Sequence, residues 1–520
     1  MRILLLNWPK IWHGAHRGGG INGYTQSLAR ILSAQHHQVL SLCGGTRRGP
    51  GMGGRCHIRR HADWESVRVF ELVNSPCRAP SALQFDDPGP EASSPELEAV
   101  LADFAAIARP DLVHIQSLEG FSAGCIESFR RAGARVVFSL HNYHTVCPQV
   151  YLMQGGAIPC RDFQSGHACV GCLTRFGPPT PRRSEDSPAI PVTIEGAADR
   201  VTIPVRAPDD ALGPMPPAGS DQRATPEGPA FDPPPEARAP LDNTPTPEPQ
   251  SDRSPNAYAH RRNAMIDALN ACDAVLAVSD FVAHKFIALG VRADRVRRLT
   301  IGTRMTERAA DEPHAIAPPT PFTEAPARPI RLVFIGHHNP YKGLPMLLDS
   351  LEACAPATLA RLHLSVFAQH AEPIEHRLRR LAPRLARLDF APGYRYDDIP
   401  WIVGGADLGV VCSTWWDNAP QTVMEFLACG VPVLGAEAGG IPDFIRHGEN
   451  GLLFRANDRT ALAATLDQLA ADPAPLDQLR AGVRPPKSLA EHAREILDLY
   501  RELLGSADAT RRPDYPPHPG

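Results

Sequence analysis

Short apolar runs alternate with segments of helical periodicity along most of this 520-residue chain. The first run, residues 2–7, is followed by Gly19 and Gly20, by helical spacing over 24–34 and by a second run over 38–42. Such short runs are typical of parallel strands that are covered on both faces. The alternation therefore predicts a doubly wound parallel α/β sheet. It continues with helices expected at 96–108 and 122–132 and strands at 112–116 and 135–140.

Proline interrupts this pattern. Twenty of the 54 prolines lie between residues 176 and 260, in a stretch with few aromatic or branched apolar residues. Such a stretch cannot bury enough apolar surface to offset the entropy of ordering it. We therefore predict a disordered Pro-rich insertion at 176–260, because the alternation resumes after it. Helices are expected at 263–271 and 281–289, and strands at 274–279 and 296–301.

A second Pro-rich break, residues 313–329, predicts a linker to another α/β series with strands at 330–335, 363–368, 408–412 and 431–434. The chain is thus expected to form two Rossmann-like domains that face a central cleft, where ligands of such sheets bind. The predicted boundaries are 1–175 and 261–312 for the first domain, 330–487 for the second, a helix at 488–505 that returns to the first domain in one reading, and a disordered tail at 506–520.

The charge balance narrows the class of partner. Lys and Arg number 53 against 57 Asp and Glu, a formal charge of −4 with His neutral, which argues against a general nucleic-acid binder. No run approaches the roughly 18 apolar residues that cross a bilayer, and residues 3–6 are too short for a secretory leader. We predict a cytoplasmic protein. Arg130, Arg131 and Arg135 offer positive charge to the inner face of a membrane, with a solvated face as the alternative.

Two carboxylates, Asp417 and Glu425, lie eight positions apart around the start of a predicted helix. Free amides and the helix dipole at such a start favour an anionic ligand. The pattern predicts a negative ligand on these amides, with the two carboxylates bonded to hydroxyls; a surface acid and an ordinary helical Glu is the alternative. The residues of the helix start are Asn418, Ala419, Pro420 and Gln421.

Two further loops of the same domain favour an anion. The loop after strand 330–335 carries Lys342, a compact positive charge suited to a phosphate, although a solvated lysine is the plain alternative. The turn at Gly439 and Gly440 is expected to present backbone amides. All three loops follow strands of one parallel sheet, so we expect them to share one edge of it.

Four of the twelve cysteines have spacing that suits a metal. Cys147, Cys160, Cys169 and Cys172 form the pattern C-x12-C-x8-C-x2-C. Four thiolates can hold a structural zinc, whereas a disulfide or free thiols are the alternatives. Because four protein ligands leave no open position, the role of such a zinc is structural.

Several motifs occur in order along the chain: the Gly-Gly loop, Leu140-His141-Asn142, Val278-Ser279, Phe334-Ile335-Gly336 with Lys342-Gly343, the acid-x7-Glu pair and Gly439-Gly440-Ile441-Pro442. This order resembles that of the retaining family-4 glycosyltransferases of GT-B fold. The resemblance covers residues 1–170 and 262–470. Its implications are transfer of a sugar from a nucleotide diphosphate donor to an acceptor hydroxyl, retention of configuration, no cofactor or metal for catalysis, and a donor held by the second domain.

The resemblance also implies roles for single residues. Lys342 would bind the diphosphate and stabilise the departing charge, Glu425 would hold the donor ribose, and Asp417 would face the sugar ring. His141 matches a histidine near the reaction centre; a strand-end histidine bonded to backbone is its alternative. Further donor contacts are implied for Gly19, Gly20, Gly336, His337, Asn418, Ala419, Pro420 and Gln421.

Two positions depart from the family pattern. Asp417 replaces the usual Glu and is one methylene shorter, which changes the reach of the carboxylate. His337 replaces the usual Arg of the phosphate loop, and an imidazole with a pKa of about 6.5 is only partly charged at neutral pH.

The sequence thus favours a retaining glycosyltransferase in the synthesis of a cell-surface polysaccharide or glycolipid, with a nucleotide diphosphate sugar and a sugar or lipid-linked acceptor as partners. The alternatives are a nucleotide-sugar epimerase on the same scaffold and a catalytically silent binding protein.

Overall fold

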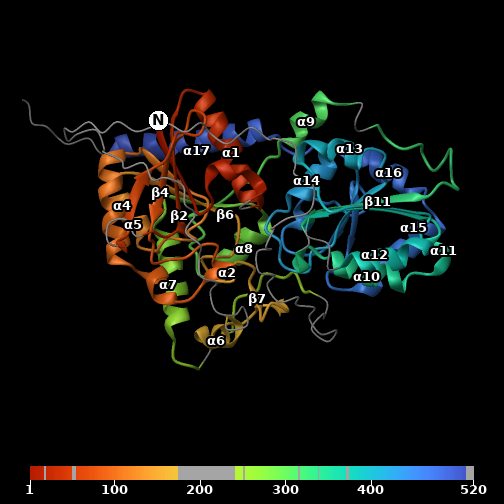
Figure 1. Cartoon of the computed structure of the whole chain (residues 1–520), viewed down its shortest axis with the longest axis horizontal. Helices are drawn as coiled ribbons and strands as arrows, with labels where there is room; N and C mark the ends of the chain where they lie inside the picture. The colour runs from red at the N-terminus through yellow and green to blue at the C-terminus, as the bar shows by residue number, and fades with distance from the viewer. Residues whose placement is uncertain are drawn as a thin grey trace, which may run out of the picture.

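The computed structural model describes residues 1–16, 19–49, 54–173, 241–249, 252–313, 317–337, 339–369 and 374–510. Two α/β lobes lie side by side, each built around its own sheet (Figure 1). The predicted fold class, two Rossmann-like domains of GT-B type, is confirmed. Most of the predicted insertion, residues 176–240, lies outside the described residues.

The sheet of the first lobe has eight strands and is parallel except for its last edge strand, β3. Residues Ile3 to Leu6 of the central strand are fully buried, as an apolar run covered by helices on both faces should be. The strand order is β10 (Val296–Arg298), β9 (Ala274–Ala277), β6 (Arg135–Leu140), β5 (Leu112–Ile115), β1 (Arg2–Asn7), β2 (Gln38–Arg47), β4 (Arg68–Val73) and β3 (His57–Arg60). Its helices include α1 (Gly19–Ala34), α2 (Ser81–Gln84), α3 (Pro88–Ala92), α4 (Pro95–Ala108), α5 (Cys125–Arg131), α6 (His167–Leu173), α7 (Ala257–Ala271), α8 (Asp280–Ala288) and α9 (Met305–Asp311), with a small hairpin of β7 (Met153–Gln154) and β8 (Ile158–Pro159).

The sheet of the second lobe is entirely parallel within the part of the chain that is described. Its strand order is β13 (Arg387–Ala391), β12 (Leu362–Gln369), β11 (Ile330–His337), β14 (Leu408–Val411), β15 (Val433–Ala436) and β16 (Gly451–Phe454). This is the 3-2-1-4-5-6 order of doubly wound sheets, in which ligands bind where the order reverses, here beyond β11 and β14. Its helices include α10 (Leu344–Ala353), α11 (Pro356–Leu359), α12 (Glu375–Leu381), α13 (Ile399–Val403), α14 (Gln421–Ala428), α15 (Arg459–Ala471) and α16 (Pro475–Gly482).

The last helix, α17 (Leu489–Thr510), returns to the first lobe and runs beside α1 (Figure 1). The hydroxyl of its Tyr500 lies 2.6 Å from Nδ1 of His114, and Nε2 of its His492 lies 2.7 Å from the hydroxyl of Tyr24. Both pairs are buried. The tail predicted to be disordered from 506 is wrong for residues 506–510, because the helix continues to Thr510; the remainder lies outside the described residues.

The predicted boundary of the insertion at 260 also needs correction. Residues 241–249, which we call the strap, and residues 252–260 are described and pack on the folded lobes. Leu241 is buried, and α7 begins at Ala257. Composition did not predict the order of the strap, because the strap is held by contacts with other segments and not by a core of its own.

No helix among the described residues is both long and apolar enough to span a membrane. The three arginines expected to face one are paired with acids: Arg130 and Arg131 with Glu127, and Arg135 with Asp273. Membrane contact stays a prediction.

Candidate functional site

Lys342 and Asp417 meet beyond the carboxyl ends of β11 and β14. The Lys342 Nζ lies 2.8 Å from the Asp417 Oδ2, and the Ser413 hydroxyl donates to the same oxygen at 3.2 Å. Only glycine lets the two loops pack this closely at position 343, because its φ is +81° and a β-carbon there would lie 1.7 Å from the Cys412 carbonyl oxygen. The Asp417 side chain is buried, whereas that of Lys342 is 37% exposed. The cation is therefore anchored by a carboxylate and still reaches solvent.

Glu425 lies on α14 and is buried. Burial raises its pKa to about 7, and the nearby charges of Lys342 and Arg304 only partly oppose this rise. The Glu425 charge in turn contributes to the raised pKa values of Tyr394 and Tyr396, although burial is the larger cause in both. A carboxyl with this pKa changes its protonation near neutral pH.

Two residues predicted in the first lobe, Gly20 and His141, lie near the start of α14 in the second lobe. The predicted glycine loop is wrong for Gly19 and Gly20, because they form the first turn of α1. A β-carbon on Gly20 would lie 3.4 Å from the Gln421 side chain, so the start of α1 faces the start of α14. Asn418 Nδ2 donates to the Leu140 carbonyl at 3.1 Å, directly before His141. Residues predicted separately in the two domains thus face one another across the interface.

His141 lies at the end of β6, where its Nε2 is 2.8 Å from the Gln116 Oε1. Burial lowers its pKa to about 4, so the imidazole is neutral at neutral pH. This side-chain contact differs from the alternative of a strand-end histidine bonded to backbone. A neutral imidazole can both donate and accept a hydrogen bond, which suits contact with a sugar hydroxyl.

The amides predicted at the Gly439 turn are already occupied. The Gly439 N–H donates to the Asn243 Oδ1 at 2.6 Å, and the Gly440 N–H donates to the Asp417 carbonyl at 2.7 Å. The expectation that this turn presents free amides to an anion is therefore wrong. No local pattern predicts this contact, because Asn243 lies 196 residues away, in the predicted Pro-rich insertion.

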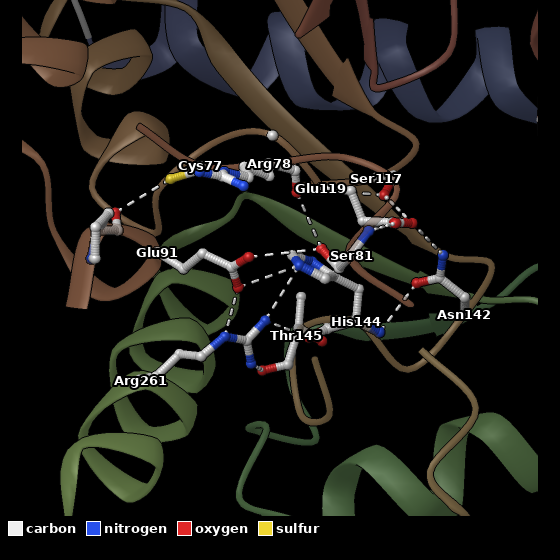
Figure 2. Close-up of polar contacts among 12 residues, drawn as sticks. Cys77, Arg78, Ser81, Glu91, Ser117, Glu119, Asn142, His144, Thr145 and Arg261 are labelled. Carbon is white, nitrogen blue, oxygen red and sulfur yellow. Dashed lines mark hydrogen bonds and ion pairs between the residues drawn. The ribbon is translucent and has the colours of Figure 1, made fainter. Parts of the chain in front are cut away.

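A buried polar cluster supports the loop that follows β6 (Figure 2). Figure 2 shows the Arg261 side chain of α7 reaching Glu91 of α3 and the His144 backbone and ring. The Arg261 Nε lies 2.6 Å from the Glu91 Oε2, with both side chains almost fully buried. Burial would raise the pKa of Glu91, but the Arg261 charge and the His144 contact outweigh it and lower the pKa to about 2.

Glu119 holds the same loop from the other side (Figure 2). It accepts from Asn142 Nδ2 at 3.2 Å and from the Ser81 backbone N–H at 2.8 Å. Burial raises its pKa, although the nearby His144 opposes the rise. No sequence pattern indicated Glu91, Glu119 or Arg261, because no local motif links segments so far apart in the chain.

The four cysteines predicted to bind zinc line one cavity, between β7, β8 and α6. Burial raises the pKa of each of Cys147, Cys160 and Cys169. Across the described ranges, no group of three or more His, Cys, Asp or Glu side chains stands in a geometry that could hold a metal ion. The structural zinc stays a prediction.

Two predicted donor residues end β11. Gly336 is buried, and the backbone of His337 completes the strand. The placement of the His337 side chain, like that of residue 338, lies outside what the structure describes. Its effect on phosphate binding stays a prediction.

Two family models match the chain and together cover more than half of it. The model described as "Glycosyl transferases group 1" matches residues 329–472, and the model described as "Glycosyl transferase 4-like domain" matches residues 19–183. The first match spans Lys342, Asp417 and Glu425, and the second spans Gly19, Gly20 and His141.

Individual relatives are more distant. WcaL of Escherichia coli (strain K12), provisionally assigned as a colanic acid biosynthesis glycosyltransferase, is 25% identical over 46% of this chain and 57% of its own length. A D-inositol 3-phosphate glycosyltransferase of Streptomyces bingchenggensis is 34% identical over 25% of this chain and 29% of its own length. The chain thus spans about half the length of the first curated relatives it matches.

Solved structures share the fold across the chain. The sucrose-phosphate synthase of Thermosynechococcus elongatus has a TM-score of 0.56 at 16% identity and covers 97% of this chain and 100% of its own. The trehalose 6-phosphate synthase of Burkholderia multivorans has a TM-score of 0.55 at 12% identity, with 99% of each chain covered.

Proposed function

Because this chain belongs to the group 1, family 4 glycosyltransferases, we propose that it transfers a sugar from a nucleotide diphosphate sugar to an acceptor hydroxyl with retention of configuration. The observation that carries the proposal is the Lys342–Asp417 ion pair next to Glu425, at the point where the strand order of the second sheet reverses. Retention and independence from a catalytic metal are part of the proposal and rest on the family pattern.

Lys342 supplies the charge that the reaction needs. A nucleotide diphosphate becomes more negative as the sugar bond breaks, and a cation fixed beside it stabilises that charge without reorganising. The ion pair with Asp417 holds the ammonium group in place. Asp417 also keeps oxygen lone pairs that can accept hydrogen bonds from sugar hydroxyls.

His141 and its neighbours suit the sugar and the acceptor. The described residues include buried polar atoms without a protein hydrogen-bond partner at three strand ends of this interface. Hydroxyl-rich ligands offer partners to such atoms. The buried atoms without a partner are Gln116 Nε2 beyond β5, Tyr143 Oη beyond β6, and Trp415 Nε1 and Asn418 Oδ1 beyond β14.

The names of the relatives support a class of acceptor. WcaL is named for colanic acid biosynthesis, and colanic acid is a polysaccharide. We therefore propose an acceptor on the route to a cell-surface polysaccharide or glycolipid, reached from the cytoplasmic side.

The proposal is tested with a panel of nucleotide diphosphate sugars, by calorimetry for binding and by nucleotide release for turnover. We expect one donor to bind saturably and to be hydrolysed slowly without acceptor. Conversion to an isomeric nucleotide sugar would instead show an epimerase. Binding of none by the folded protein would contradict the proposal and favour the silent-protein alternative.

The pH dependence of donor binding tests the role of Glu425. The ionised carboxylate accepts hydrogen bonds from both ribose hydroxyls, whereas the protonated form has lost part of that capacity. With a pKa raised to about 7, the ionised fraction increases with pH, so we expect donor affinity to rise between pH 6 and pH 8, by up to about tenfold. Calorimetry across this range would measure it.

Glu425→Gln is the control for this prediction, because glutamine has the same shape and does not titrate. We expect its donor affinity to be weaker and nearly constant over the same pH range. An equal rise in the variant would assign the pH dependence to another group.

A further inference from the structure

The strap binds the Gly439 turn through one side chain. Asn243 Nδ2 donates to the Gly439 carbonyl at 3.0 Å, while the Gly439 N–H donates to the Asn243 Oδ1 at 2.6 Å. One amide side chain thus satisfies both backbone groups of a single residue. Gly439 has a φ of +58°, so this pair of bonds fixes the peptide orientation of a residue in the left-handed region.

The strap is tied to both lobes. On the second lobe, the Leu241 N–H donates to the Ala456 carbonyl at 2.9 Å, and the Trp416 indole donates to the Asp242 carbonyl at 3.3 Å. On the first lobe, Arg161 donates to the same Asp242 carbonyl at 2.7 Å and pairs with its carboxylate.

A second tie to the first lobe is almost fully buried. The Glu248 carboxylate pairs with Arg262 of α7 at 2.7 Å, with side chains 12% and 5% exposed. Separating an ion pair this buried would leave two poorly solvated charges, which costs far more than breaking an exposed pair. The strap therefore has fixed points on either side of Asn243.

The Gly439 turn supports Asp417 directly. A β-carbon on Gly439 would lie 2.1 Å from the Asp417 carbonyl oxygen, which means that the two backbones are in close contact. Next to it, the Gly440 N–H donates to that same carbonyl. Contacts therefore run without a break from Asn243 to Gly439, to Asp417 and to Lys342.

We propose that the strap is a brace of the catalytic site and that Asn243 is a positioning residue, which sets the orientation of the Lys342–Asp417 pair through Gly439. This inference rests on the proposed function for its effect on turnover. The strap, which is part of the predicted Pro-rich insertion, would then have a role in catalysis. It contributes no group to the reaction, but it fixes the loop that carries Asp417. A displacement of about 1 Å at reacting groups can cost a large factor in rate.

Asn243→Ala tests the contact first, without reference to activity. Hydrogen exchange of the Gly439 amide should become faster by about tenfold or more, because its acceptor is lost. Thr246→Ala is the matched control: Thr246 is an exposed residue of the same strap, and we expect the exchange of Gly439 to be unchanged in it. Unchanged exchange in Asn243→Ala would overturn the contact.

Turnover then tests the positioning role. With the donor identified above, Asn243→Ala should lower kcat by about tenfold or more and change KM by much less, because the loss concerns stabilisation of developing charge. Asn243→Gln retains a donor and an acceptor and should recover part of kcat. Asn243→Asp should not, since a carboxylate cannot donate to the Gly439 carbonyl.

The outcomes separate the two proposals. Faster exchange with unchanged or higher kcat would overturn the positioning role, and a higher kcat would make the strap an inhibitor. A wild type that turns over no donor would contradict the proposed function, whereas hydrogen exchange would still decide whether Asn243 holds Gly439.

Discussion

Lys342→Ala is expected to lower kcat by about 10²–10³-fold, the cost of removing one preorganised group that stabilises developing charge. The Lys342 side chain is partly exposed at the point where the strand order of the second sheet reverses, and its Nζ lies 2.8 Å from the Asp417 Oδ2. Steady-state nucleotide release, measured with the donor found in the panel, would report the loss.

The substitution also leaves the buried Asp417 carboxylate without its cation, which has to be separated from the loss of charge at the phosphate. The double variant Lys342→Ala with Asp417→Asn removes that unpaired charge. If kcat recovered fully in the double variant, the lysine would act only by neutralising Asp417. Arg379→Ala, a highly exposed cation of the same lobe paired with Glu375, should leave kcat unchanged.

Arg261→Met is expected to destabilise the first lobe by about 3–5 kcal/mol, the usual cost of leaving one partner of a buried ion pair alone. The variant leaves Glu91 buried without its cation and removes the donors that reach the His144 carbonyl. Urea denaturation would measure the change, as a shift of the first unfolding transition. Arg130→Ala, at an exposed pair with Glu127, should change stability by less than about 0.5 kcal/mol.

The sign of the pH dependence follows from the pKa of Glu91. In the folded wild type this pKa is lowered to about 2, so the pair stabilises the fold above the unfolded pKa and loses that effect as pH falls toward 2. In Arg261→Met burial still raises the pKa of Glu91 and only the His144 contact opposes that rise, so the carboxyl becomes protonated more easily. The difference between the two proteins should therefore shrink as pH is lowered from 8 to about 5. A constant difference would show that packing, and not charge, is lost.

The features that were predicted correctly from the sequence are those that depend on local patterns. The run at residues 2–7 and the helix start at Pro420 have signatures that depend on a few neighbouring residues, and both elements form as expected. Lys342 and Asp417 were predicted from separate loops, and the topology of a parallel sheet brings such loops to one edge.

What the sequence did not reveal depends on contacts between distant segments. Glu91 and Arg261 lie 170 residues apart, on either side of the insertion, and no periodicity links them. The strap was assigned to disorder because composition reports the ability to build a core, whereas Asn243 and Glu248 are held by single partners on the lobes. The pKa of Glu425 likewise arises from burial in the assembled interface.

The return of α17 to the first lobe has a consequence for how the protein can be divided. The side chains of Tyr500 and His492 complete the interior around His114 and Tyr24, although they follow the second lobe in the chain. A fragment that stops in the 313–329 segment would lack both and would open the face of α1 to water, while the complementary fragment would carry an amphipathic helix with nothing to cover it. Separately expressed halves should therefore be cut on both sides of the second lobe, with α17 rejoined to the first.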